Sequence, residues 1–271
     1  MKTKSKSMAR ENLAHDSKVL GKKWNNTYNK YFGSKKNMLS FVKQVIPYTL
    51  KMSKVQVLYA CSGPGFLGEE LLNELEKKRI RADLVLLDIS KEHLSQNKNQ
   101  KTRKICADLL KAKIEGKFDI IIMRSSLDYF WTEKTQIQAL KKLEKMLKPT
   151  GVFFNQAASM PTLMQRNLAD KIYSSNEKMG KRHFQCPADI AKICLAGGFS
   201  KIKKIGNAPE LIVTEKEHIE RYSTSKKNIA KIQGIINKIP AEKRPNIKLT
   251  KTGYSLKFIF PIYAAKATGR F

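Results

Sequence analysis

Two glycines and two aspartates in the first half of the chain have the types and spacing of a nucleotide-binding site. Gly63 and Gly65 stand in a turn directly after an apolar run, and glycine lets a ligand approach the backbone closely. The turn leads into a helical pattern, whose first N–H groups have no partner within the helix. Asp88 follows the next apolar run and Asp108 the one after it. A carboxylate at the first position suits ribose hydroxyls, and one at the second suits an adenine amino group.

The elements that must position these residues are short apolar strands separated by helices. In the first half we expect strands at 55–60, 82–87, 105–107, 118–123 and 152–154, and helices at 66–78, 91–97 and 135–147. Continuous apolar strands separated by such helices are typical of βαβ units, whose parallel sheet is covered on both faces. Ligands of such sheets bind outside the carboxyl ends of the strands, where the glycine turn and both aspartates fall.

The second half of the chain does not continue the regular alternation of strands and helices. We expect a helix over 187–196, a strand over 199–205 and a final strand over 254–263. The organisation that follows is a basic tail and helical cap in 1–50, then one domain over 51–271 with insertions at about 156–185 and 215–247.

Several segments together resemble the class I S-adenosylmethionine-dependent methyltransferases. The stretch 57–68 is similar to the family's first motif, 86–90 to the acidic end of its second strand, and 106–110 to the segment that holds adenine. The stretches 118–124, 147–153, 196–199 and 254–263 resemble the family's later strands. The resemblance covers about 55–265. It implies a Rossmann-like α/β three-layer sandwich with a seven-stranded, mostly parallel sheet whose last strand is antiparallel.

The resemblance implies S-adenosyl-L-methionine as cofactor and assigns residues to it. In chain order these are Tyr28, Tyr31, Ala60, Cys61, Gly63, Gly65, Asp88, Ile89, Asp108, Leu109 and Arg124. The two tyrosines lie in an aromatic segment similar to the one with which small-molecule members close over the cofactor. A plain amphipathic helix is the alternative for that segment.

One position departs from the family pattern. Tyr59 stands where the family usually has the acid that holds the methionine amino group, and Glu69 or Glu70 could take over that role. The spacing Gly63-x-Gly65-x-x-Gly68 also fits a nicotinamide-dinucleotide fingerprint. The methyltransferase hypothesis is preferred because it also accounts for Asp108 and the 148–153 segment.

Methyl transfer depends chiefly on alignment, and a base is needed only where the acceptor is protonated at neutral pH. The candidates for this role are Asp128, Tyr129 and His183. Their structural alternatives are a helix cap, a packing residue and a surface residue, respectively.

The four cysteines form no C-x-x-C pair, so we expect neither a metal site nor disulfides. Cys61, Cys106 and Cys194 are expected as buried thiols, which indicates a reducing, cytoplasmic compartment.

The formal net charge of +30 bears on the partner. Such a charge attracts nucleic acid, but lysine far outnumbers arginine here, which is what a lysine-rich genome would give. A small-molecule acceptor is favoured, because the Asn/Asp-Pro-Pro-Tyr/Phe signature of nucleic-acid amino methyltransferases is missing. An RNA- or ribosome-directed enzyme and a non-catalytic scaffold remain alternatives. No run of about 18 apolar residues predicts a membrane span, and the basic start lacks the apolar core of a secretory signal.

Overall fold

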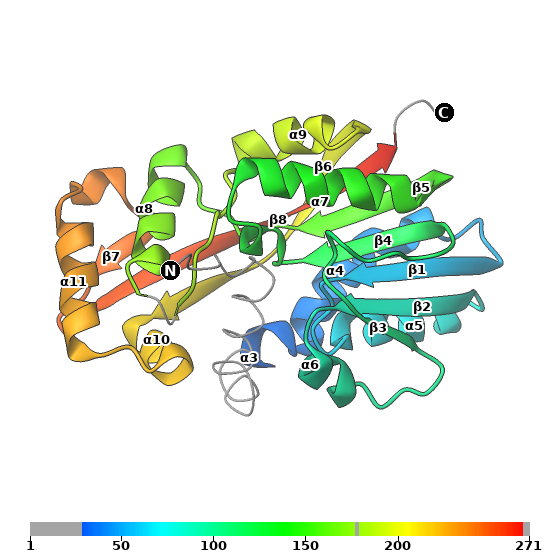
Figure 1. Ribbon diagram of the computed structural model, residues 1–271, viewed down its shortest axis with the longest axis horizontal. Coiled ribbons are helices and arrows are strands. Elements are labelled where there is room, and N and C mark those ends of the chain that lie inside the picture. Colours follow the sequence, from blue (N-terminus) through cyan, green and yellow to red (C-terminus); the bar gives the residue numbers. More distant parts are fainter. Residues whose placement is uncertain (1–28, 177–178, 268–271) are drawn as a thin grey trace, which may run out of the picture.

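The computed structural model describes residues 29–176 and 179–267. Its one sheet has the strand order β3-β2-β1-β4-β5-β8-β6, and β7 pairs with β8 beside this path (Figure 1). The strands are β1 (Lys54–Ala60), β2 (Arg81–Asp88), β3 (Arg103–Cys106), β4 (Phe118–Arg124), β5 (Leu147–Gln156), β6 (Phe199–Thr214), β7 (Ile247–Leu249) and β8 (Tyr254–Ala267). β1 to β5 are parallel, and β8 is antiparallel to both β5 and β6. The expected fold class is confirmed, and β7 is an addition to it.

Helices cover both faces of the sheet. They are α3 (Asn29–Phe32), α4 (Lys35–Val45), α5 (Phe66–Lys77), α6 (Lys91–Gln96), α7 (Glu133–Met146), α8 (Leu163–Ser174), α9 (Pro187–Ala196), α10 (Glu215–Tyr222) and α11 (Lys226–Asn237). Side chains of β1 alternate between two cores: Val57 and Tyr59 pack with α4 and α5, whereas Leu58 and Ala60 face the core of α7 and α9. Burial on both faces explains why the parallel strands read as continuous apolar runs.

Helix starts follow local capping chemistry. The Ser90 hydroxyl accepts a hydrogen bond from the His93 N–H at the start of α6, as the sequence predicts. Thr132 and Thr135 form a reciprocal capping box at α7, and Thr214 and Glu217 form another at α10. The expected helices at 66–78, 91–97, 135–147 and 187–196 are all present, with ends that differ by no more than two residues.

β6 and β8 are longer than the sequence predicts. Both extend beyond the rest of the sheet as a two-stranded ribbon, which pairs Ala208 with Phe260 and Val213 with Leu256. The expected strands at 199–205 and 254–263 were therefore too short. The reason is that register shifts occur around Gly206 and between Ala208 and Leu211, which breaks the simple alternation along β6. Helices α8, α10 and α11 gather with β7 around this ribbon, at the left of Figure 1.

Two of the expected buried thiols are not buried. Cys106 is exposed and Cys61 is partly exposed, whereas Cys194 is buried. Cys106 ends β3, which is the edge strand of the sheet, so one side of that strand has no neighbour to cover it. The basic tail at 1–10 and Tyr28 lie outside the described residues. Within the described part of the chain, no helix is both long and apolar enough to cross a bilayer.

Candidate active site

The glycine turn after β1 has a tightly constrained backbone. Cys61, Gly63 and Gly65 all have positive φ, at 51°, 56° and 80°. A Cβ atom at Gly65 would lie 2.3 Å from Cδ1 of Leu86, so β2 leaves no room for a side chain there. No atom lies within 4 Å of the corresponding position at Gly63. The turn is thus packed against β2 at Gly65 and opens onto free space at Gly63, directly before α5 begins.

Asp88 joins this turn to the end of β2. Its Oδ2 accepts a hydrogen bond of 2.8 Å from the Gly63 N–H, and its Oδ1 accepts one of 2.8 Å from the Ser90 N–H. The structure therefore brings together the two residues that the sequence placed at one edge. A carboxylate at the end of this strand is the kind of group that accepts hydrogen bonds from ribose hydroxyls.

Asp108 lies on the next strand end and is less buried. The Ala107 N–H donates to the Asp88 carbonyl (2.9 Å), which ties the end of β3 to the end of β2. Oδ1 of Asp108 accepts from the Leu110 N–H at 3.0 Å, and Leu109 is buried beneath it. Ile89 is half-buried and its carbonyl accepts from the Cys106 thiol. These residues line the same edge as the glycine turn.

Tyr59 is buried beside this edge, and neither neighbouring glutamate replaces the family's acid in an obvious way. Burial raises the pKa of Tyr59 to about 12, so the phenol is neutral. The Glu69 carboxylate accepts hydrogen bonds from Asn97, Asn99 and Thr102, at 2.7 to 2.8 Å. The Glu69 carboxylate is therefore occupied in holding the segment after α6 in place. Glu70 is buried in α5.

Arg124 and Tyr31 fasten α3 over the sheet. Nη2 of Arg124 donates to the Phe32 carbonyl (2.7 Å), and its guanidinium lies 4.9 Å from the centre of the Phe32 ring. The Tyr31 hydroxyl donates to the Pro209 carbonyl, and its ring lies 5.1 Å from that of Phe260. Both residues, expected at the cofactor, hold α3 between β4 and the β6–β8 ribbon.

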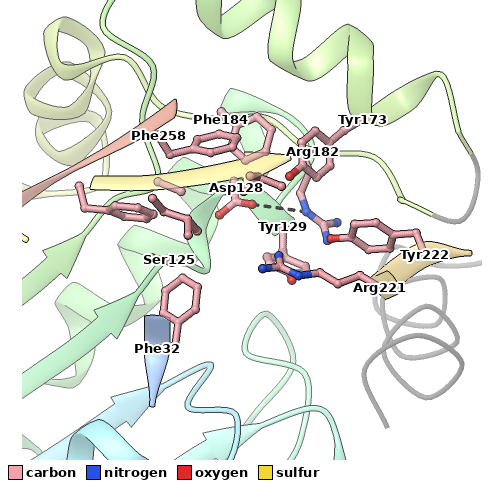
Figure 2. Close-up of a pocket in the computed structure, with 14 residues that line it drawn as sticks. Phe32, Ser125, Asp128, Tyr129, Tyr173, Arg182, Phe184, Arg221, Tyr222 and Phe258 are labelled. Atoms are coloured by element: carbon pink, nitrogen blue, oxygen red, sulfur yellow. Dashed lines mark ion pairs between the residues drawn. The ribbon is translucent and has the colours of Figure 1, made fainter. Parts of the chain in front are cut away.

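A pocket lies between α3, the end of β4 and the ribbon (Figure 2). Its volume is about 420 Å³ including its open mouth. We call it the arginine pocket; its lining is Phe32, Ser125, Asp128, Tyr129, Ala158, Tyr173, Arg182, Phe184, Leu211, Val213, Arg221, Tyr222, Phe258 and Phe260.

Asp128 is the carboxyl group of this pocket. It is 4% exposed, and its Oδ2 lies 3.4 Å from Nε of Arg182. Burial raises the pKa of Asp128 to about 7, and the nearby Arg182 opposes this rise. Among the described residues, nothing donates a hydrogen bond to its Oδ1 or pairs with the buried Ser125 hydroxyl. Two buried oxygens at one end of the pocket therefore remain available to a ligand.

The other two candidate bases have different surroundings. The Tyr129 ring lies 3.6 Å from the Arg182 guanidinium, so it supports that arginine. The His183 ring lies 2.9 Å from Nη1 of Arg166 and 3.5 Å from Asp170, and it is not part of the pocket lining. His183 reaches the site only through its backbone, whose N–H donates to the Asp128 carbonyl.

Sequence reasoning missed Arg182, Arg221, Tyr173 and Tyr222. Arg182 lies in the segment between α8 and α9, and Arg221 lies on α10. Both are almost fully buried. A signal existed, because an arginine within each insertion of a lysine-rich chain suggests a geometric role that lysine does not fill.

Comparison with known proteins gives a family match for the part of the chain that carries the glycine turn and both aspartates. A family model described as a methyltransferase domain matches residues 60–153, which span the glycine turn, Asp88, Asp108 and Arg124. Over these residues the chain is similar to the methyltransferase-domain family, in agreement with the resemblance seen in the sequence.

One curated protein is similar in sequence, and solved structures are similar in fold. Malonyl-[acyl-carrier protein] O-methyltransferase of Priestia megaterium is 28% identical over 139 residues, which are 49% of this chain and 48% of that protein. The chain thus matches about half the length of this curated relative. YcgJ of Bacillus subtilis has a TM-score of 0.66 at 16% identity, covering 84% of this chain and 98% of that one. An S-adenosylmethionine-dependent methyltransferase of Clostridium acetobutylicum has a TM-score of 0.53 at 16% identity, covering 91% and 98%.

The described residues fit the cofactor of this family. Gly63 opens onto free space, and the Asp88 carboxylate, the type of group that suits ribose hydroxyls, stands beside it. Asp108 lies one strand further along, on the side expected for adenine. Tyr59 differs from the usual acid, so the methionine end of the cofactor must be held by other groups.

Proposed function

We propose that the chain transfers a methyl group from S-adenosylmethionine to a small molecule bound in the arginine pocket. One observation carries this proposal: the segment 125–128, which follows β4 and contributes to the pocket, contacts the glycine turn. The Ser126 hydroxyl lies 3.3 Å from the Cys61 carbonyl, and Ser126 stands between the pocket residues Ser125 and Asp128. An acceptor in the pocket would therefore lie next to a cofactor held at that turn.

The cofactor contacts that we propose are Ala60, Cys61, Gly63, Gly65, Asp88, Ile89, Asp108 and Leu109. We assign Arg124 and Tyr31 a supporting role, because their hydrogen bonds to the Phe32 and Pro209 carbonyls hold α3 in place. When bound, S-adenosylmethionine supplies a methyl group on a sulfonium centre, whose C–S bond breaks as an acceptor atom attacks the methyl carbon. The residues of the chain need only align the acceptor, exclude water and handle its proton.

Asp128 is suited to receive that proton. A base acts best when its pKa lies near the working pH, and burial places that of Asp128 at about 7. As a hydroxyl or amine of the acceptor forms its new bond to the methyl carbon, its proton would pass to Oδ1 of Asp128. Arg182 stabilises the ionised carboxylate beforehand, from a distance of 3.4 Å.

Calorimetric titration of the purified chain with S-adenosylmethionine and with its demethylated product tests the cofactor site. We expect micromolar binding of both compounds and its loss in Asp88→Ala. Asp83→Asn, on the same strand but exposed, is the matched control and should bind as the native chain does. Thermal melting of each variant separates lost binding from lost folding. A folded native chain that binds neither compound would sink the proposal.

The remaining alternatives can be tested in the same preparation. A steep fall of RNA affinity between low and moderate salt would favour the nucleic-acid acceptor that the charge of +30 suggests. Cofactor binding without transfer to any acceptor would favour the scaffold. The cytoplasmic location expected from the cysteines stays a prediction.

A further inference from the structure

Two buried oxygens of the arginine pocket have complementary hydrogen-bonding needs. Ser125 and Asp128 both line the pocket, and they are 6% and 4% exposed. Within the described part of the chain, the Ser125 hydroxyl and Oδ1 of Asp128 have no hydrogen-bond partner. A hydroxyl has a proton to donate, whereas an ionised carboxylate oxygen only accepts. A ligand group that both accepts and donates therefore satisfies the two oxygens together.

The backbone fixes the place of the Ser125 hydroxyl. Ser125 has a φ of 50°, in the left-handed region that serine rarely adopts. Its N–H donates to the Gln156 carbonyl at the end of β5 over 2.7 Å, which holds the chain as it leaves β4. Strained residues of this kind persist only where the surrounding structure holds them, and they gather at ligand sites. Two neighbouring strands therefore place a serine hydroxyl at this point of the pocket.

Few ligand groups serve both oxygens. A carboxylate or an ether has no proton to donate to Oδ1 of Asp128, and an alkylammonium has no lone pair for the Ser125 hydroxyl. A neutral hydroxyl has both, and its oxygen is also a nucleophile. Burial raises the pKa of Asp128 to about 7, which is much closer to the pKa of a phenol, about 10, than to that of water, about 16. Proton transfer from a phenol is therefore the better matched reaction.

Much of the remaining lining consists of aromatic rings. Phe184, Phe258 and Phe260 are 4%, 3% and 2% exposed. The ring centres of Phe184 and Phe258 lie 4.9 Å apart, and Figure 2 shows both rings above Asp128. Rings arranged in this way gain edge and stacking contacts with a further aromatic ring. The lining therefore favours an aromatic body over a saturated one.

We propose that the acceptor is a phenol and that its oxygen is methylated. The phenolic hydroxyl would accept a hydrogen bond from Ser125 and donate one to Oδ1 of Asp128, with its ring against Phe184 and Phe258. As the phenol oxygen attacks the methyl carbon, its proton passes to Oδ1, and the C–S bond breaks with its electron pair left on the sulfur. The products are an aryl methyl ether and the neutral demethylated cofactor. This inference rests on the proposed function, because it names the acceptor class of the same site.

Three probes of similar size separate the hydroxyl from the ring. 4-Methylphenol has both, 4-fluorotoluene keeps the ring without the proton donor, and 4-methylcyclohexanol keeps a hydroxyl on a saturated ring. The full chain is titrated with each, and binding is followed by ligand-observed nuclear magnetic resonance. We expect 4-methylphenol to bind at least about fivefold more tightly than either analogue. Equal binding of all three, or no binding of 4-methylphenol, overturns the inference.

Transfer of labelled methyl from S-adenosylmethionine then separates a phenol from an amine. We expect labelled 4-methylanisole from 4-methylphenol, and at least about tenfold less product from 4-methylaniline, whose nitrogen is a poor acceptor for the Ser125 hydroxyl. Transfer that favours the aniline assigns the site to amines and overturns the inference. So does a chain that binds the cofactor and transfers nothing to 4-methylphenol.

Variants of Ser125 locate the preference. Ser125→Ala should lose about fivefold in affinity for 4-methylphenol and nothing for 4-fluorotoluene. Ser125→Gly removes the same hydroxyl and suits the positive φ, so it serves if the alanine variant does not fold. Ser174→Ala, at an exposed position of α8, is the matched control and should change neither affinity. An unchanged preference for the phenol in a folded Ser125 variant contradicts the assignment.

The two proposals fail in different ways. Selective binding of 4-methylphenol by a chain that binds no S-adenosylmethionine refutes the proposed function alone, because this titration needs no cofactor. Binding of S-adenosylmethionine without a preference for the phenol refutes the acceptor class alone.

Discussion

The cofactor edge and the arginine pocket are built in different ways. At the edge, Asp88 fixes the turn through backbone N–H groups of Gly63 and Ser90, and all of the participants lie within one βαβ unit. In the pocket, the fixed contacts join side chains from distant parts of the chain, such as Asp128 with Arg182. Backbone chemistry leaves a motif in the sequence, whereas side-chain pairing across insertions does not. The cofactor class could therefore be recognised early and the acceptor could not.

Asp128→Asn is expected to have the largest effect and to separate the function of the pocket from that of the cofactor edge. We expect a loss of at least about 100-fold in kcat with S-adenosylmethionine affinity unchanged, because general base catalysis contributes roughly 10²- to 10⁴-fold. The measurement is transfer of labelled methyl from S-adenosylmethionine to a small-molecule acceptor found by screening, alongside calorimetry with the cofactor. Asp189→Asn, in the first turn of α9, is the control. Full activity of Asp128→Asn would remove this residue from the mechanism.

Gly65→Ala should damage the cofactor edge and leave the pocket intact. The added Cβ would meet Leu86 at 2.3 Å in a backbone with φ of 80°, so we expect a loss of about 1–3 kcal/mol in the free energy of unfolding and weaker cofactor binding. Gly234→Ala, within α11 and with free space around it, should be neutral or stabilising by up to about 1 kcal/mol. Chemical denaturation measures both. Equal effects of the two changes would contradict the tight packing of the turn.

The difference in pH dependence of stability between the native chain and Asp128→Asn reports on the pocket, because groups elsewhere, such as the buried His218, titrate in both proteins. Asp128 has a folded pKa of about 7 against an ordinary value of 3.8, so the folded state holds the extra proton between these values. Its contribution to the free energy of unfolding therefore falls as pH rises, by at most about 1.4 kcal/mol per pH unit. Arg182 and Asp170 are the charged groups that act on it. Denaturation at about pH 5 and about pH 8 should show a flatter profile in Asp128→Asn than in the native chain. Identical profiles would refute the raised pKa.

Tyr31→Phe tests the link between the regions and has the smallest expected effect. It removes the hydrogen bond to the Pro209 carbonyl and keeps the ring on Phe260, so we expect a loss of about 1 kcal/mol in the free energy of unfolding. Tyr48→Phe, whose ring packs on Phe154, should change stability less. If cofactor affinity falls more than tenfold while stability holds, Tyr31 contacts the cofactor as the sequence predicted, and its supporting role is wrong.

The sequence by itself determined the parallel part of the fold. Apolar runs ending at Ala60, Asp88 and Arg124, with helical periodicity between them, predict the strands and helices of a parallel sheet through local patterns. Gly63, Asp88 and Asp108 could be placed at one edge because parallel strands end on the same side of a sheet.

Only the tertiary structure decided what the remaining residues do. The lengths of β6 and β8 depend on their mutual pairing across register shifts, and the exposure of Cys106 depends on β3 being the sheet's edge. Arg182, from the segment before α9, and Arg221, from α10, line one pocket although they lie far apart in the chain. Contacts between residues far apart in the chain leave no period or spacing in the sequence. The cofactor edge could therefore be predicted from the sequence, whereas the arginine pocket could be identified only in the tertiary structure.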